Sequence, residues 1–134
     1  SIMAWELVEV ARLRPHERTL PWRVEEMVEK IQRNNFFHKP LLVDRSTLTI
    51  LDGHHRHQAS IRLGLKRVPA MVFDYQEDER VVVEARPPAV PESVSKALVM
   101  HVAANGLLME PKSSKHRIHV EIPRLRVPLA DLTS

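Results

Sequence analysis

The stretch Leu51-Asp52-Gly53-His54-His55-Arg56 predicts a strand, a sharp turn and a helix in direct succession, and this order decides the fold. An apolar strand ends at Leu51, Gly53 breaks the backbone, and a helix runs from about His54 to Leu63. The first turn of a helix has free N–H groups and a partial positive charge, so the residues His54, His55 and Arg56 gather donors for an anion, most naturally a phosphate. Gly53 lets a ligand approach the backbone closely.

Asp52 is the unusual member of this stretch, because a carboxylate beside a phosphate site is unfavourable unless it binds a cation or a proton. Its position therefore suggests either Mg²⁺ binding or general-base work. The plainer alternative is that Asp52 caps the helix that follows and that the two histidines are surface residues.

Working outward, apolar periodicity predicts an α+β fold with short connections. A helix begins at Pro21 and ends at Asn35, and Gly64 stands where a left-handed helix end belongs. The predicted strands cover 6–13 (an edge strand), 40–43 and 48–51 (a hairpin), 68–73, 81–83 and 118–122. The predicted helices cover 21–35, 54–63 and 92–105.

Two further segments carry chemistry. Lys112-Ser113-Ser114-Lys115-His116-Arg117 places cations and hydroxyls in a predicted loop over 110–116, where they could bind phosphate oxygens or form a solvated basic turn. Pro15-His16-Glu17 contains a glutamate that, by composition alone, is an ordinary surface residue.

Composition narrows the function classes. The 134 residues fit one domain, 1–134, with 43% apolar residues. The chain has no cysteine, which excludes disulfides, thiolate metal sites and cysteine nucleophiles. A cytoplasmic setting is compatible with this lack of cysteine.

No apolar run approaches the roughly 20 residues of a membrane helix, and no secretion leader is expected. The histidines have neither HExxH spacing nor a cysteine partner, so a structural zinc site is not expected. Twenty basic against 17 acidic residues give a net charge of only +3, which permits an anionic ligand without demanding a nucleic acid.

Taken together, Asp52-Gly53-His54-His55-Arg56, the helix ending at Leu63-Gly64 and the following Val68-Pro69 resemble the ParB/sulfiredoxin superfamily. Sulfiredoxins carry a cysteine in this turn, and this chain has none. ParB partition proteins bind CTP through a Gly-Glu-Arg-Arg turn and continue into a helix-turn-helix, which residues after 105 do not resemble. The chain is similar to the free L-serine kinases, a branch of archaeal enzymes with a bacterial siderophore-pathway relative, at Pro15-His16-Glu17, at 52–56 and at Pro111-Lys112-Ser113-Ser114-Lys115-His116.

This resemblance implies a cytoplasmic archaeal kinase that phosphorylates free L-serine to O-phospho-L-serine, in the context of cysteine biosynthesis. It implies Mg²⁺ as cofactor and ATP, in preference to ADP, as donor. Glu17 is the implied catalytic base, and Asp52 acts as a second carboxylate or a Mg²⁺ ligand. The implied nucleotide and phosphate contacts are Gly53, His54, His55, Arg56, Ser113, Ser114, Lys115 and His116.

Other readings stay open at this point. The main alternative is a ParB-like, nucleotide-dependent DNA-binding or partition protein, which the small net charge disfavours. A nucleotide sensor without activity is a third reading, although such a sensor needs neither Glu17 nor Asp52. Arg86 and Arg18 are conceivable partners for the serine carboxylate on the basis of charge alone. The partners expected are nucleotide and free L-serine, with no membrane.

Overall fold

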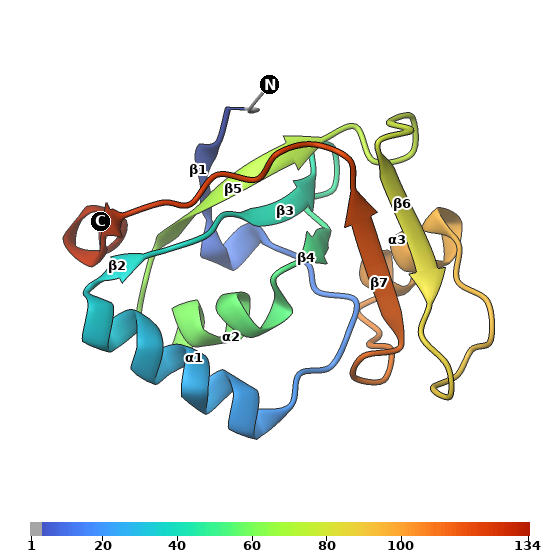
Figure 1. Cartoon of the computed structure of the whole chain (residues 1–134), viewed down its shortest axis with the longest axis horizontal. Coiled ribbons are helices and arrows are strands. Elements are labelled where there is room, and N and C mark those ends of the chain that lie inside the picture. Colours follow the sequence, from blue (N-terminus) through green and yellow to red (C-terminus); the bar gives the residue numbers. More distant parts are fainter. Residues whose placement is uncertain (1–3) are drawn as a thin grey trace.

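A computed structural model describes residues 4–134, and its centre is a four-stranded mixed sheet (Figure 1). The strands lie in the order β1 (Glu6–Glu9), β5 (Arg67–Phe73), β3 (Leu41–Asp44) and β4 (Ile50–Asp52). β3 and β5 are parallel, and the other two pairs are antiparallel. This mixed sheet with separate helices confirms the α+β prediction, the 40–51 hairpin and the position of β1 at an edge.

Strand β3 is buried on both faces, which explains its unbroken apolar sequence. Leu41 and Val43 face the helices α1 (Pro21–Asn34) and α2 (His54–Arg62), where they join one apolar cluster with Ile31. Leu42, between them, packs in a second cluster with Phe73, Val81 and Val99. The sheet therefore holds α1 and α2 on one side and a further layer on the other.

That further layer is the antiparallel pair β6 (Val81–Ala85) and β7 (Ser114–Ile118) together with α3 (Lys96–Ala104). In Figure 1, these three elements lie together beside β4. The register pairs Val81 with Ile118 and Ala85 with Ser114. The C-terminal segment of the chain is brought in this way alongside the turn after β4.

The last residues of the chain return to the side of the sheet that holds α1 and α2. β8 (Val127–Pro128) pairs over two residues with β2 (Phe36–Phe37), and a short 3-10 helix (Leu129–Leu132) buries Leu132 completely. A second 3-10 helix, Val10–Arg12, follows β1.

Four boundary predictions need correction. The strand expected at 118–122 lies at 114–118, because β6 begins opposite Ile118 and pairs back as far as Ser114, so the last three residues of the expected 110–116 loop are strand. The strand expected at 6–13 stops at Glu9 and continues as the 3-10 helix. The helix expected from 92 begins at Lys96, after Ser95 has capped it by accepting a bond from Leu98 N–H at 3.1 Å. The pairing of Phe36–Phe37 with the tail was not predicted.

Within residues 4–134, none of the helices combines the length and the apolar character needed to cross a bilayer.

Gly53 is the position where the fold most clearly requires glycine. Its φ is +111°, and a Cβ there would lie 2.8 Å from Leu41 Cγ and 3.1 Å from Arg56 Nη2. Left-handed backbone and a blocked Cβ position both act against any larger residue. Gly64 also has a positive φ, +71°, but a Cβ there meets nothing within 4 Å.

We expect Gly53→Ala to lower the free energy of unfolding by about 2–4 kcal/mol, because backbone strain and overpacking add. Gly64→Ala is the matched control and should cost roughly 1 kcal/mol, from backbone conformation alone. Urea unfolding of both variants measures the difference. Equal losses would show that the contacts with Leu41 and Arg56 do not constrain the turn.

Candidate functional site

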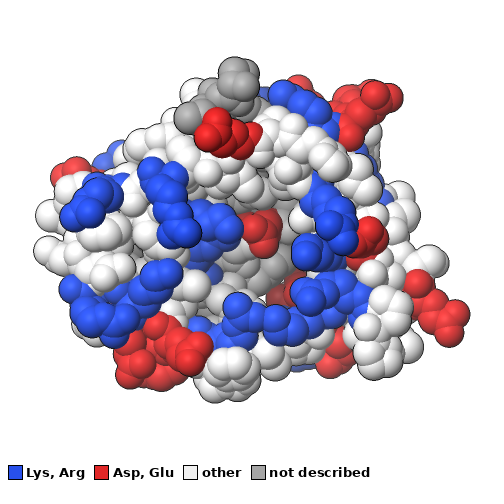
Figure 2. All heavy atoms as spheres, viewed as in Figure 1, with Lys and Arg blue, Asp and Glu red and all other residues white. Residues whose placement is uncertain are grey.

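The predicted site residues converge on one cavity of about 780 Å³. It lies between the start of α2, the first half of α1, the segment around Glu17 and strand β7. Figure 2 shows Lys and Arg side chains around a hollow that has acidic atoms within it. Two carboxylates, Glu17 and Asp52, line the cavity with eight basic side chains: Arg23, Lys30, Lys39, Arg56, Arg86, Lys112, Lys115 and Arg124. This excess of positive charge suits a polyanionic ligand.

Glu17 is held in this wall by residues almost 100 positions away. Its Oε1 accepts bonds from Ser114 N–H at 3.2 Å, Ser114 Oγ–H at 3.0 Å and Ser113 Oγ–H at 3.4 Å. Its Oε2 accepts a bond from Lys112 N–H at 3.2 Å. Burial raises the pKa of Glu17, although these hydrogen bonds pull the pKa in the opposite direction. The structure thus joins two of the segments singled out in the sequence.

His54 and His55 are held as neutral hydrogen-bond donors. The backbone N–H of His16 donates to His54 Nε2, and the N–H of Leu20 donates to His55 Nε2, both at 3.1 Å. A nitrogen that accepts a bond carries no proton, so Nδ1 of each neutral ring carries it. Burial lowers the pKa of both histidines, and the charges of Arg23 and Lys112 lower the pKa of His55 further.

Asp52 and Arg56 differ from the sequence expectation in their surroundings. Asp52 ends β4 and Gly53 is the N-cap of α2, with no side-chain cap bond, so the capping alternative for Asp52 is wrong. The Asp52 side chain is 49% exposed and lies 3.5 Å from Arg56 Nη2. Arg56 is buried and also donates from Nη1 to the carbonyls of Lys39 and Pro40. Arg56 therefore ties α2 to β3 and gives only part of its guanidinium to the cavity.

The C-terminal segment contributes a wall of the cavity. Ser114, Lys115 and His116 line it, while Ser113 is fully buried behind them against Glu17. Lys115 is exposed and joins no ion pair within residues 4–134.

Other protein groups already engage the hydrogen-bonding atoms of the His116 ring. Its Nε2 bonds the Tyr75 hydroxyl at 2.8 Å, and a backbone bond to Leu51 engages the ring as well. Burial and the charges of His16 and Lys96 lower the pKa of His116 to about 3. The ring therefore serves as a neutral wall, and the structure gives no support to a direct phosphate contact or proton shuttle through it.

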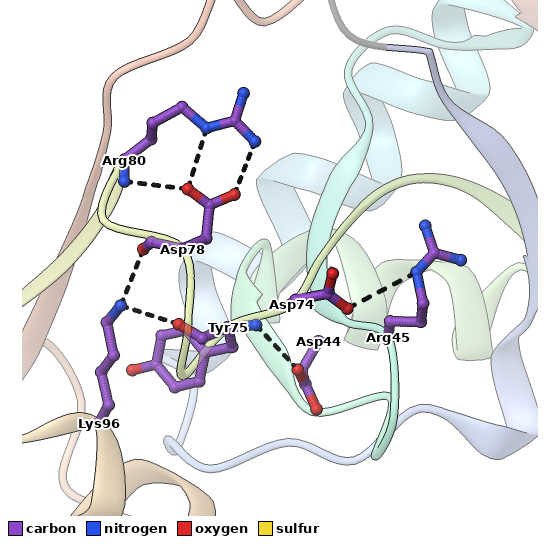
Figure 3. Close-up of polar contacts among 7 residues, drawn as sticks. All are labelled: Asp44, Arg45, Asp74, Tyr75, Asp78, Arg80 and Lys96. Atoms are coloured by element: carbon purple, nitrogen blue, oxygen red, sulfur yellow. Dashed lines mark hydrogen bonds and ion pairs between the residues drawn. The ribbon is translucent and has the colours of Figure 1, made fainter.

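Tyr75 is itself held in place through its backbone by Asp44 and Lys96. Figure 3 shows its N–H donating to Asp44 and its carbonyl accepting from Lys96, whose ammonium also bonds the carbonyl of Asp78. These distances are 3.1, 2.8 and 3.0 Å respectively. The network supports the cavity wall behind His116.

Several cavity residues carried no sequence signal. Lys30, His38, Lys39 and Arg124 also line the cavity, yet none of them belongs to a motif that the sequence singles out. Burial and the charges of the cations around it lower the pKa of His38 to about 4. Within residues 4–134, no group of three or more His, Cys, Asp or Glu side chains could hold a metal by itself.

Comparison with known proteins places this geometry in context. The family described as the ParB N-terminal domain matches residues 2–86. A ParB-like protein of Sulfolobus acidocaldarius is 39% identical over 88 residues, which is 66% of this chain and 44% of that protein. An ATP-dependent L-serine kinase of Staphylothermus marinus is 34% identical over 113 residues, which is 81% of this chain and 44% of that protein.

An ADP-dependent L-serine kinase of Thermococcus kodakarensis is 32% identical over 76 residues, covering 54% of this chain and 31% of that protein. The chain thus spans less than half the length of each of these three relatives. Among solved structures, a free serine kinase variant in complex with AMP superposes with a TM-score of 0.88 at 16% identity, over 98% of this chain and 95% of that chain. This last likeness shows the shared fold.

Acid should destabilise this protein early, because the site buries neutral histidines. Burial lowers the pKa of His16 to about 4, against an ordinary 6.5. Below pH 6.5 the unfolded chain therefore binds protons that the folded chain refuses, and stability falls as the pH drops. The raised pKa of Glu17 acts in the opposite direction, but it is one group against several histidines.

We expect the free energy of unfolding to fall by at least about 2 kcal/mol between pH 7 and pH 5, the contribution of one such histidine. Urea unfolding at the two pH values measures this. Constant stability down to pH 5 would contradict the neutral, buried state of these rings.

Proposed function

The chain belongs to the family of ParB N-terminal domains, and within that family we propose that it is a kinase that phosphorylates free L-serine. It would transfer the terminal phosphoryl group of a nucleotide to the serine hydroxyl, giving O-phospho-L-serine. The similarity to L-serine kinases supports this, since one of them aligns with 81% of the chain. The archaeal source, the cytoplasmic setting and the link to cysteine biosynthesis stay predictions.

One observation carries the proposal: the carboxylate of Glu17 lines the same cavity as the N-terminus of α2. Phosphoryl transfer needs a site that positions the phosphates and a group that orients the attacking hydroxyl. The helix end, with Gly53 and the Nδ1–H donors of His54 and His55, provides the first. Glu17 provides the second.

The transfer follows from these positions. Glu17 accepts the proton of the serine hydroxyl while the hydroxyl oxygen bonds to the terminal phosphorus of the nucleotide. The bond from that phosphorus to the bridging oxygen breaks, which leaves ADP from ATP or AMP from ADP. Charge on the transferring group is met by helix N–H groups and by the ammonium of Lys115. The raised pKa of Glu17 makes it a stronger proton acceptor than an ordinary carboxylate.

The residues present fit a magnesium ion held with the nucleotide. Mg²⁺ keeps several waters and binds one or two carboxylates together with substrate phosphates, so it needs no cage of protein ligands. Asp52 offers a half-exposed carboxylate on the cavity, with one oxygen beside Arg56. Asp52 would hold the ion, which would neutralise phosphate charge when bound.

We take ATP as the expected donor, because the kinase relative that covers most of this chain is named ATP-dependent. The ADP-dependent relative makes ADP the comparison to run. The DNA-binding alternative is less well supported, because eight of the 20 Lys and Arg residues line the cavity. A concave site for a small anion uses much of the charge that a DNA surface would need.

The direct experiment incubates the protein with L-serine, Mg²⁺ and either ATP or ADP, and follows the products by ³¹P NMR. We expect a phosphomonoester signal identical to that of authentic O-phospho-L-serine. Retention of DNA at about 150 mM salt, where weak electrostatic binding fades, with no phosphoserine formed, would favour the DNA-binding alternative instead.

Glu17→Gln should lower turnover by about 10²-fold or more, since it removes the base, while the Kd for nucleotide stays nearly constant. In the wild type, kcat should fall as the pH drops through the raised pKa of Glu17. Steady-state kinetics across pH, with nucleotide titrations, measure both effects. Wild-type turnover in the variant would remove Glu17 from the mechanism.

Asp52→Asn should abolish most activity with only a small loss of stability, because Asp52 is half exposed, caps no helix, and is replaced by an amide whose oxygen can still accept a bond from Arg56. The free energy of unfolding should fall by no more than about 1 kcal/mol, the scale of a partly exposed ion pair. Thermal unfolding and turnover are measured on the same preparation. If the variant keeps full activity at limiting Mg²⁺, Asp52 has no role with the metal.

A further inference from the structure

Three basic side chains gather at the Glu17 end of the cavity. Arg23 lies in the first helical turns of α1, Arg86 follows β6 directly, and Lys112 lies in the turn before β7. All three line the cavity. In residues 4–134, none of them forms an ion pair with a carboxylate within 4.0 Å. Three cations without such a partner beside one carboxylate indicate room for an anion.

Backbone contacts hold these cations around Glu17. Lys112 N–H donates to Glu17 Oε2 at 3.2 Å, and Lys112 adopts a left-handed φ of 56°. Arg86 N–H donates to the Ser113 carbonyl at 3.0 Å, which fixes Arg86 beside the same turn. The Leu20 N–H bond to His55 brings the start of α1, with Arg23, against the start of α2.

The charges of the neighbouring side chains also affect the pKa of Lys112. Desolvation lowers the pKa of Lys112, and the charges of Arg23 and Arg86 lower it further, while Glu17 opposes them. Lys112 is therefore close enough to both arginines to be repelled by their charges. An anion between them would relieve that repulsion.

We propose that Arg23, Arg86 and Lys112 form the subsite for the carboxylate of the amino-acid acceptor. This rests on the proposed function, because it names how that acceptor is held. In serine, the carboxylate and the hydroxyl are separated by only two carbon atoms, so a carboxylate beside Lys112 leaves the hydroxyl within reach of Glu17. The phosphates have other donors, at the start of α2 and at Lys115.

The structure also decides between the two arginines that charge alone suggested. The Arg18 side chain is exposed, lies 3.8 Å from Glu110 and does not line the cavity. Arg86 lines the cavity and contacts the Glu17-binding turn through its backbone. Arg18→Met is thus a matched control, because it removes the same charge from a residue that is next to Glu17 but does not line the cavity.

The test uses L-alanine and L-alaninamide, which differ at the carboxylate and have no hydroxyl to phosphorylate. Binding of each is measured by calorimetry in the presence of saturating AMP, for the wild type, Arg86→Met, Arg23→Met and Arg18→Met. We expect the wild type to prefer L-alanine by about 10-fold or more, the scale of a charge-assisted contact. Arg86→Met and Arg23→Met should lose that preference and keep the Kd for AMP, and Arg18→Met should match the wild type.

Kinetics with L-serine distinguish this inference from the function on which it rests. Arg86→Met should raise the KM for L-serine by about 10-fold or more with a smaller change in the KM for nucleotide. If phosphoserine forms and the variant keeps its KM for serine, or loses nucleotide affinity instead, the subsite is wrong and the kinase assignment stands. If no phosphoserine forms but Arg86→Met still abolishes the preference for L-alanine, the subsite is supported and the serine kinase assignment fails.

Discussion

The site depends on the four hydrogen bonds that the Glu17 carboxylate accepts from Lys112, Ser113 and Ser114. These bonds join the segment between the 3-10 helix Val10–Arg12 and α1 to a turn almost 100 residues later. They hold the β6–β7 pair against the sheet on the side where α2 begins. The carboxylate that closes the cavity structurally is therefore the one placed to act as a base. Its partial burial, which raises the pKa, follows from the same contacts.

Neutral and charged groups occupy different parts of the cavity wall. Histidines deep in the wall stay neutral, because burial lowers their pKa and backbone N–H groups occupy Nε2 of His54 and His55. Permanent charge comes instead from Lys and Arg at the rim, as in Figure 2. A phosphate at the start of α2 would meet neutral donors, which add no charge to that of the surrounding cations. Arg56 is an exception, because its buried guanidinium mainly anchors α2 to β3.

The sequence predicted the parts of the site that follow from local patterns. Gly53 before an amphipathic helix and the cation-rich 112–117 segment are local features, and the structure places both at the cavity. The sequence could not predict that Ser114–Ile118 is a strand, because the inward positions of this strand hold Ser114 and His116 in place of apolar residues. Nor did the sequence reveal that Tyr75 and Leu51 hydrogen-bond to His116, or that Arg23, Arg86 and Lys112 line one cavity. Those contacts join residues far apart in the chain, and only the topology brings them together.

The central claim is that the start of α2 and the turn at Lys112–Ser114 form one phosphoryl-transfer site through Glu17. The most direct measurement is an ADP titration followed by ¹H–¹⁵N NMR of the backbone amides. The account predicts that the amides of Gly53, His54 and His55 and those of Lys112, Ser113 and Ser114 shift together with a single Kd. Shifts confined to one of the two segments, with the other unmoved at saturation, would contradict it.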